Sequence, residues 1–208
     1  TPPGTGSRLM TLTEENDLYQ HFARPIADRI RLMAVGPFTE SDLGVKCYHS
    51  KTGSVELLLN HLVDRSQEYV LVDMTAGADS FASGLFTRFD ITFLVVEPTL
   101  KSVSVYEQYK SYAKQYNVCI KAIGNKIEEK DDITFIRDYV GEDLVGYVTR
   151  SSYIRKMEKG ISLPLEEFED ENMQTLAAIH QEIDSQKKDW VTFYQQAIEF
   201  HRKNALSW

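Results

Sequence analysis

Nearly continuous apolar stretches that end in polar residues constrain the fold of this chain more than any other feature. Ile91–Val96 (ITFLVV) leads directly into Glu97-Pro98, and Val118–Ile123 leads into Gly124-Asn125-Lys126. A strand that is apolar along its length must be covered on both faces, which is typical of a parallel sheet between two layers of helices. These stretches therefore predict an α/β fold.

Three further segments have strand character. Tyr69–Met74 (YVLVDM) is apolar except for Asp73 near its carboxyl end, and Thr75-Ala76-Gly77 follows it. Leu144–Val148 is a weaker candidate, and Arg31–Val35 is closed by a Gly-Pro pair, which is a turn signal. We expect the first two of these segments to join the same sheet.

Helical periodicity separates the strands. Apolar residues recur at spacings of three and four at Val105, Tyr109, Tyr112, Ala113 and Tyr116, at Ile133, Ile136 and Val140, and at Val55, Leu58, Leu59 and Leu62. Ser54 is suited to cap the helix at 55–62, and Asp131 or Asp132 is suited to cap the helix that Gly141 ends. Because strands alternate with helices, right-handed crossovers and a three-layer domain with a mostly parallel sheet are expected.

Two helical stretches follow Pro164. Spacing groups Met173, Leu176, Ala177 and His180 in the first stretch, and Trp190, Phe193, Tyr194, Ala197, Ile198 and His201 in the second. We expect residues 1–160 to form the α/β domain and residues 161–208 to be its helical extension. The last helix is expected to pack against a protein surface, with association with a membrane surface as the less favoured alternative.

Charge and cysteine content exclude several classes of protein. The chain of 208 residues has 31 acidic and 23 basic residues, giving a net charge of −8. This excess, without a basic block, argues against a nucleic-acid-binding surface. Cys47 and Cys119 are too few for a disulfide scaffold. A reducing, cytoplasmic environment is therefore expected. No apolar run approaches the ~18 residues of a membrane-spanning helix, so we expect a globular protein.

Ligands of open parallel sheets bind beyond the carboxyl ends of the strands. We therefore expect Asp73, Glu97, Asn125 and Thr149 to line one crevice. Asp73, followed by Gly77, is suited to a Mg²⁺-associated carboxylate beside a phosphate-sensing loop, although it is equally suited to cap a helix.

Asn125-Lys126 is a weaker signal for a purine site. The Asn amide is able to hydrogen-bond the edge of the ring while the Lys stem covers its face, but on the residues alone an ordinary turn is favoured.

Two other segments resemble ligand sites. Pro2–Arg8 (PPGTGSR) is similar to a phosphate-binding loop, but Ser7 stands in the place of the lysine and no strand precedes it, so we interpret it as a surface loop. Cys47-Tyr48-His49 places a thiol and an imidazole in a predicted loop, and a two-fold dimer would complete a Cys₂His₂ metal site. On chemistry alone, a half-buried cysteine beside an exposed histidine is favoured. Cys119 lies within a strand and is interpreted as core.

Together, the motifs YVLVDMTAG, FLVVEPTLKSV and IKAIGNKI resemble the MinD/ParA class of P-loop ATPases, and within it the CooC-like nickel/carbon monoxide dehydrogenase accessory ATPases. The similarity covers residues 60–150. It implies an ATP- and Mg²⁺-dependent homodimer. Asp73 then occupies the Walker B position, catalytic and bound to Mg²⁺ through water, and Gly77 lies in the switch II loop. The residues implied at the nucleotide are Pro98, Asn125, Lys126, Thr149 and Arg150.

The same resemblance bears on Cys47 and His49. CooC-like proteins carry a C-x-C pair before the helix that precedes Walker B, where it holds a transition metal at the dimer interface. Cys47-x-His49 falls in this place, so the resemblance favours a metal role more strongly than the residues alone do.

The family's first strand–loop–helix unit, with its phosphate-binding lysines, is expected ahead of Thr1 and is not in this sequence. We therefore expect the 208 residues to be a C-terminal portion that does not hydrolyse ATP by itself. Two functions remain open. The first is a nucleotide-dependent dimer switch that positions a client protein or matures a metal centre. The alternative is a non-catalytic α/β interaction module that has lost the phosphate loop.

Overall fold

The computed structural model describes residues 2–13, 16–36, 48–63, 65–74 and 84–206. It comprises two compact units, one formed by Thr1–Arg88 with Asp189–Trp208 and the other by Phe89–Lys188. We refer to them as unit 1 and unit 2, and each is described by itself.

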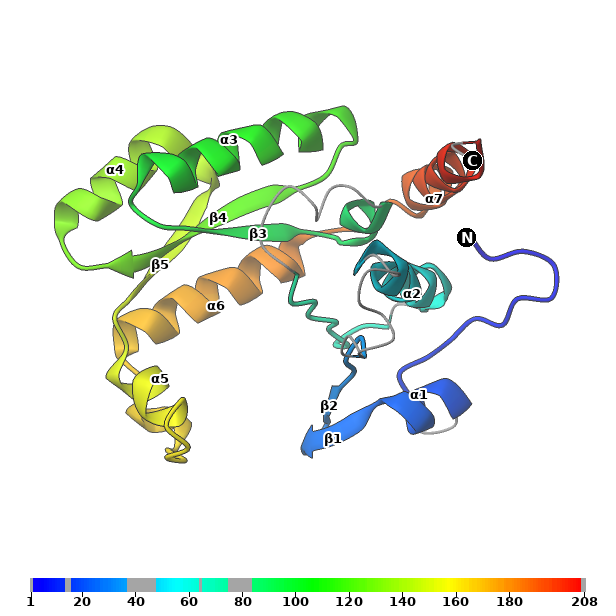
Figure 1. Cartoon of the computed structure of the whole chain (residues 1–208). Coiled ribbons are helices and arrows are strands. Elements are labelled where there is room, and N and C mark those ends of the chain that lie inside the picture. Colours follow the sequence, from blue (N-terminus) through cyan, green and yellow to red (C-terminus); the bar gives the residue numbers. More distant parts are fainter. Residues whose placement is uncertain (1, 14–15, 37–47, 64, 75–83, 207–208) are drawn as a thin grey trace. The chain divides into compact units, whose positions relative to one another are not determined.

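Unit 2 contains the parallel sheet that the sequence predicts. Its strands are β3 (Thr92–Val96), β4 (Ile120–Ile127) and β5 (Leu144–Thr149), hydrogen-bonded in the order β3-β4-β5. Helices α3 (Leu100–Gln115) and α4 (Lys130–Val140) cover one face of this sheet, and α6 (Asp170–Ser185) covers the other along β5 (Figure 1). The expected three-layer α/β arrangement with parallel strands is thus confirmed.

The helices of this unit begin and end at recognisable signals. Thr99 caps α3 by accepting a hydrogen bond from the Ser102 N–H at 3.2 Å. Asp132 accepts from the N–H groups of Glu128 and Glu129 at the start of α4, and Gly141, at φ +62°, ends it as expected. The two helices bury Val103, Tyr106, Tyr109, Ala113, Ile136 and Val140.

The buried face of α3 differs from the predicted stripe. Val105 and Tyr112 are 38% and 39% exposed, whereas Val103 and Tyr106 are buried. Tyrosines occur on several faces of this helix, so the apolar pattern alone did not fix the rotation of its buried face.

Helix α6 lies against β5 through a polar face. Its buried residues are Asn172 and Thr175, while Leu176 is 44% exposed. A Cβ at Gly146 would lie 3.0 Å from both Cγ2 and Oγ1 of Thr175, so a larger residue would require Thr175 to move away from β5. The predicted grouping of Met173, Leu176, Ala177 and His180 as the packed face is therefore wrong, because contact with β5 is made by the face centred on Asn172 and Thr175. Short helices α5 (Ser152–Met157), η4 (Gly141–Asp143) and η5 (Leu165–Glu167) complete unit 2.

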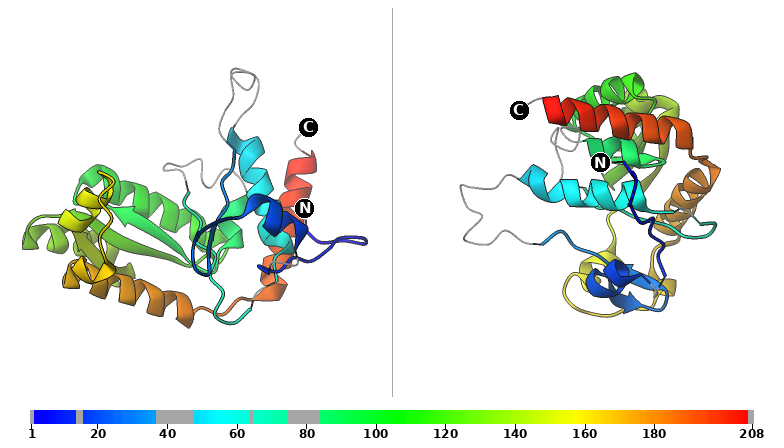
Figure 2. Two further views of the ribbon diagram at one scale, coloured as in Figure 1. Left: turned by 90° about the horizontal axis from the view of Figure 1, so that it is seen from below. Right: turned by 90° about the vertical axis from the view of Figure 1, so that its right-hand side faces the viewer.

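Unit 1 is mostly helical. It contains α1 (Asp17–Phe22), a hairpin of β1 (Arg24–Ala27) and β2 (Ile30–Leu32), α2 (Tyr48–His61), η3 (Gly84–Arg88) and α7 (Trp190–Leu206). Helix η3 contacts both α2 and α7 (Figure 2). The core of unit 1 contains five buried apolar residues from these three helices, namely Leu59, Leu85, Phe86, Phe193 and Ala197.

Arg88 is 3% exposed in this core. Its guanidinium donates to Asn60 Oδ1 at 3.0 Å and to the Phe193 carbonyl at 2.8 Å, and it lies 4.1 Å from the centre of the Phe193 ring. Burial lowers the pKa of Arg88 to about 10. This one side chain therefore joins η3 to both α2 and α7.

Three local predictions for unit 1 are wrong. Tyr69–Met74 has no regular secondary structure, and Leu71 is 84% exposed. A strand is stabilised by hydrogen bonds to a neighbour, and no described strand pairs with this segment. Helix α2 begins at Tyr48, so Ser54 lies inside it and His49 is helical rather than in a loop. The strand expected at Arg31–Val35 is limited to Ile30–Leu32, where the hairpin partner ends.

Candidate functional site

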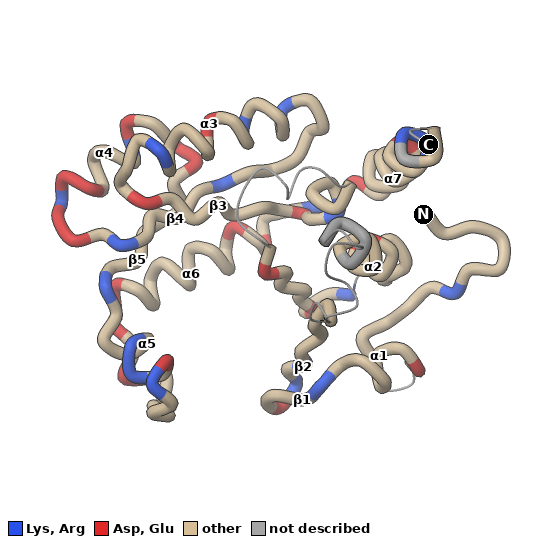
Figure 3. Tube along the Cα trace, in the orientation of Figure 1, with Lys and Arg blue, Asp and Glu red and all other residues tan. Residues whose placement is uncertain are grey.

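The carboxyl ends of β3, β4 and β5 meet at one edge of the unit 2 sheet, at the left of Figure 1. Parallel register pairs Val96 with Gly124, and Ile127 with Thr149. Glu97, Asn125 and Thr149 therefore lie at the same edge, as three of the four crevice residues were predicted to do. Both acidic and basic residues occur at this edge (Figure 3).

Strand β4 is irregular at the predicted purine-binding pair. Between Gly124 and Ile127, β4 advances three residues while β5 advances two, from Tyr147 to Thr149, so β4 carries a bulge at Asn125-Lys126. Lys126 has φ +57°, a conformation that costs free energy in a residue other than glycine. Bulges and strained backbone of this kind occur often beside functional sites, where they redirect side chains.

Ion pairs link the strand ends. Lys126 Nζ lies 2.6 Å from Glu97 Oε1, which joins β4 to β3. Arg150 lies 3.5 Å from Glu128 Oε1, which joins the end of β5 to the loop after β4. Lys126 and Arg150 are 67% and 85% exposed, so water screens both pairs and leaves the cations accessible to a ligand. Pro98 is half-buried directly after Glu97.

A second polar network holds the segment after β5, and the sequence did not predict it. Asn172 Oδ1 accepts from the Thr149 N–H at 2.9 Å and from Thr149 Oγ1 at 3.2 Å. Asn172 Nδ2 donates to Glu169 Oε2 at 3.3 Å, and the Glu169 carboxylate also accepts from Ser151 Oγ at 2.7 Å and the Ser152 N–H at 2.8 Å. No sequence motif joins 149–153 to 169–172, because they meet only when α6 folds back on β5.

These hydrogen bonds change the acidity of Glu169. The bond from Ser151 Oγ and those from the N–H groups of Ser152 and Tyr153 lower its pKa to about 2, against some opposition from burial. The carboxylate therefore stays charged at neutral pH and stabilises the start of α5.

The other predicted site residues belong to unit 1 or lie outside the described residues. Asp73 belongs to unit 1 and is exposed, which suits a carboxylate that binds a cation through water. Gly77 and Cys47 lie outside the described residues. His49 is in the first turn of α2, and its side chain also lies outside the description. Among the described residues there is no group of three or more metal-binding side chains.

A separate ion-pair cluster lies toward the opposite edge of the same sheet. Asp143 pairs with Lys110 and, at 3.5 Å, with Lys121, and it accepts from the Tyr106 hydroxyl at 2.6 Å. Burial and this hydrogen bond raise the pKa of Tyr106. Cys119 directly precedes β4 and is half-buried, so the prediction that it lies within a strand as part of the core is wrong. Burial raises the pKa of its thiol, which does not suit a reactive role.

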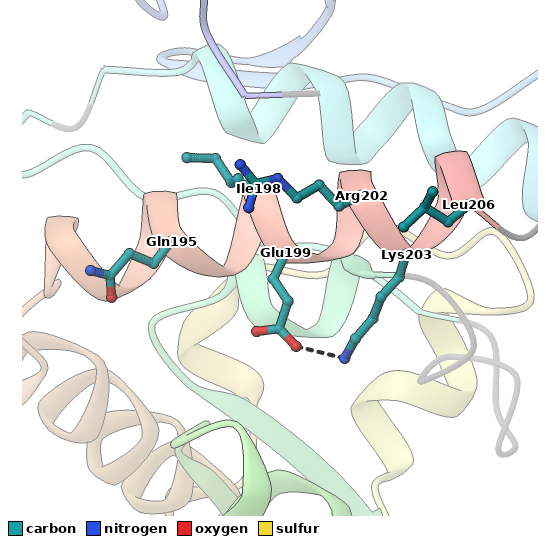
Figure 4. Close-up of a pocket in the computed structure, with 6 residues that line it drawn as sticks. All are labelled: Gln195, Ile198, Glu199, Arg202, Lys203 and Leu206. Atoms are coloured by element: carbon teal, nitrogen blue, oxygen red, sulfur yellow. Dashed lines mark ion pairs between the residues drawn. The ribbon is translucent and has the colours of Figure 1, made fainter.

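The exposed surface of α7 has a shallow depression (Figure 4). It is lined by Gln195, Ile198, Glu199, Arg202, Lys203 and Leu206, with Lys203 paired to Glu199 at 2.6 Å. Among the helices in the described part of the chain, none is long and apolar enough to cross a membrane. The buried residues Phe193 and Ala197 show that the opposite side of α7 packs within unit 1, as favoured.

Comparison with known proteins identifies relatives. No protein-family model matches the chain. The carbon monoxide dehydrogenase accessory protein CooC of Rhodospirillum rubrum is 29% identical over 153 residues, which cover 73% of this chain and 57% of that protein. Two uncharacterised ATP-binding proteins of Methanocaldococcus jannaschii are 28% and 21% identical over 163 and 146 residues, covering 75% and 69% of this chain.

This chain covers only part of each relative, namely 57% of CooC and 62% and 58% of the two archaeal proteins. The chain thus spans less than two thirds of the length of each of them. Within that span, the relatives confirm the resemblance to CooC-like, MinD/ParA-type ATPases that the strand-end motifs indicated.

Proposed function

We propose that the protein to which this chain belongs is a nucleotide-dependent dimer switch of the CooC-like, MinD/ParA type. ATP and Mg²⁺ bring two subunits together, and hydrolysis separates them. Two of its relatives are named as ATP-binding proteins, and the third is named as an accessory protein of an enzyme. By analogy, the switch positions a client protein or matures its metal centre.

One structural observation carries this proposal. The carboxyl edge of a parallel sheet is the usual ligand-binding position in α/β folds. Here it bears a backbone bulge with a strained Lys126, and Lys126 and Arg150 are two accessible cations at this edge. The Asn125 amide has both donors and acceptors for the edge of a purine, and the Lys126 stem is suited to cover its face. Thr149, Arg150 and Pro98 form the rim in this proposal.

Other residues act on the phosphates in this proposal. The exposed Asp73 carboxylate has the hard oxygen ligands that Mg²⁺ prefers and holds it through water. Mg²⁺ bound there supplies charge neutralisation at the phosphates. Gly77, which follows Asp73 in the sequence, serves as the hinge of the loop that responds to the terminal phosphate.

Equilibrium binding tests the nucleotide site. The natural full-length protein is expected to bind ATP more tightly with Mg²⁺ than without it. Asn125→Ala and Lys126→Ala are each expected to weaken ATP binding about tenfold. Lys114→Ala, at an exposed position of α3 distant in sequence from this edge, is the matched control and should change the affinity less than about twofold. If the unmodified protein has no affinity for ATP at millimolar Mg²⁺, the proposal fails and the interaction-module alternative is supported.

We also propose that Cys47 and His49 of two subunits bind one transition metal at the dimer interface. Thiolate and imidazole are suitable ligands, and two copies of each complete a tetrahedral site. Purified dimer should contain about one metal ion per two chains, and Cys47→Ser should lose it while Cys119→Ser retains it. Metal-free protein that remains dimeric would contradict this part of the proposal and leave the nucleotide site unaffected.

A further inference from the structure

The network around Asn172 contains the most completely buried polar side chain of unit 2 among the described residues. Asn172 is 0% exposed and comes from the first turns of α6. It contacts Thr149 at the end of β5 and Glu169 at the start of its own helix. A buried amide is costly unless it is paired, so this position depends on both partners.

Chemistry fixes the orientation of the Asn172 amide. The Thr149 N–H is a donor only, so the amide oxygen must face it. The ionised Glu169 carboxylate is an acceptor only, so the amide nitrogen must face Glu169. The observed distances of 2.9 Å and 3.3 Å agree with this assignment. Thr149 therefore donates to Asn172, and Asn172 donates to Glu169, so both hydrogen bonds point the same way along this chain.

The far end of this chain holds the segment that follows Thr149. Glu169 accepts from Ser151 Oγ at 2.7 Å and from the Ser152 N–H and Oγ at 2.8 Å and 3.2 Å. The segment is thus fixed at Thr149 by Asn172 and at Ser151-Ser152 by Glu169. Arg150 lies between these two points, with its side chain directed to Glu128 rather than to the network.

Register connects the clamp to the proposed nucleotide site. Thr149 pairs with Ile127, the residue after Lys126. Any displacement of the Thr149 backbone therefore changes the spacing between the β4 bulge and the end of β5. Every contact in this argument lies within unit 2.

We infer that Asn172 and Glu169 are positioning residues that clamp the Thr149–Ser152 segment and thereby preorganise the nucleobase rim beside Asn125-Lys126. This inference rests on the proposed function. The two residues touch the rim and not the ligand, so their loss weakens recognition of the base and leaves recognition of the phosphates unchanged.

A pair of substitutions that exchanges the amide and the carboxylate tests the clamp in the natural full-length protein. Asn172→Asp keeps the acceptor for Thr149 but places a second carboxylate against Glu169, so the Kd for MgATP should rise about tenfold at pH 8. Adding Glu169→Gln restores a donor opposite the new carboxylate, and the double variant should recover most of the affinity. Asn117→Asp, the same substitution at an exposed position before β4, is the control and should have no effect.

Two readouts separate positioning from general damage to the fold. Binding of Mg²⁺-tripolyphosphate, which has no base, should stay within about twofold in Asn172→Asp. ATP affinity of this variant should improve as the pH falls from 8 to 5, because the facing carboxylates then share a proton, whereas the unmodified protein should show no such dependence.

Each outcome decides the question. If Asn172→Asp binds ATP as tightly as the unmodified protein, the inference is overturned and the proposed function stands. The inference also fails if ATP and tripolyphosphate are lost together, or if Glu169→Gln brings no recovery. The proposed nucleotide function fails if the unmodified protein binds no ATP, or if it binds ATP no more tightly than Mg²⁺-tripolyphosphate. In either case the inference fails with it.

Discussion

Buried polar side chains in both units are positioned by partners that are distant in sequence. Arg88 reaches Asn60 and Phe193, and Asn172 reaches Thr149. A sequence gives the identity of such residues but not their partners, because arginine and asparagine are more often exposed. For this reason Arg88, Asn172 and Glu169 were not predicted, although each holds two or more elements together.

Arg88→Ala should destabilise the protein. It removes the donor for three acceptors, Asn60 Oδ1, the Phe193 carbonyl and Thr87 Oγ1. It also leaves a cavity where the guanidinium lies against the Phe193 ring. We expect the free energy of unfolding in urea to fall by about 2–4 kcal/mol. Arg65→Ala, at an exposed position of the same unit, should change it by less than about 0.5 kcal/mol. Equal stability of the two variants would mean that Arg88 contributes no net stabilisation.

Glu169 should make the stability of the fold depend on acidic pH. Its pKa is lowered from 4.5 to about 2 in the folded protein. A lowered folded-state pKa means that the stabilisation is fully present above the unfolded value and is lost as the pH falls through that interval. The urea midpoint of the unmodified protein should therefore drop between pH 5 and pH 2 by more than that of Glu169→Gln.

The exposed Glu166→Gln is the control for this comparison and should reproduce the unmodified profile. Parallel profiles for the Glu169→Gln variant and the unmodified protein would contradict the assigned role of the Glu169 carboxylate. Asp132, Asp143 and Asp189 also have lowered pKa values, so only the difference between variants is diagnostic.

At the scale of elements, the packing of α6 on β5 depends on close contacts at glycine residues. Thr175 lies over Gly146 and donates from Oγ1 to the Tyr147 carbonyl at 2.7 Å. Gly124 is similarly close to Tyr147, whose Cβ lies 3.0 Å from the position that a Gly124 Cβ would occupy. Neither glycine stands out in the sequence, since glycine in a strand equally indicates a bulge or a turn.

Gly146→Ala should destabilise unit 2 by overpacking. The new methyl group would lie 3.0 Å from Thr175 atoms and push α6 away from β5. We expect a loss of about 1–3 kcal/mol in the free energy of unfolding. Combining it with Thr175→Ser, which removes Cγ2 but keeps the hydroxyl, should recover part of this loss.

Gly53→Ala, in contrast to Gly146→Ala, should stabilise the protein. Gly53 lies within α2 with nothing within 4 Å of an added Cβ, so the change should stabilise the helix by about 0.5–1 kcal/mol. A destabilising effect at both glycines would indicate a general intolerance of alanine rather than a close contact at Gly146.

For the whole molecule, the proposed switch requires that nucleotide and subunit association be linked. Binding that occurs only in the dimer shifts the monomer–dimer equilibrium toward the dimer by mass action. Sedimentation velocity of the natural protein should therefore show more dimer with ATP and Mg²⁺ than without nucleotide. Asp73→Ala should lose this response, whereas Asp28→Ala, at an exposed hairpin position, should keep it. A nucleotide-independent oligomeric state would rule out the switch while leaving ATP binding possible.

The sequence by itself determined the α/β class, the parallel strands β3, β4 and β5, and the placement of Glu97, Asn125 and Thr149 at their carboxyl ends. These properties follow from local pattern, because a continuous apolar run requires burial and the residue after it must lie at the edge of the sheet. The motifs also indicated the CooC-like relatives.

Only the tertiary structure decided which residues complete that edge. The β4 bulge depends on pairing with β5, and the Asn172–Glu169 clamp depends on α6 folding back along the sheet. The same dependence explains the failure at Tyr69–Met74, whose apolar residues predict a strand although no strand in the described part of the chain pairs with it. Strands and buried polar networks are stabilised by contacts between distant segments, and these are set by topology rather than by local composition.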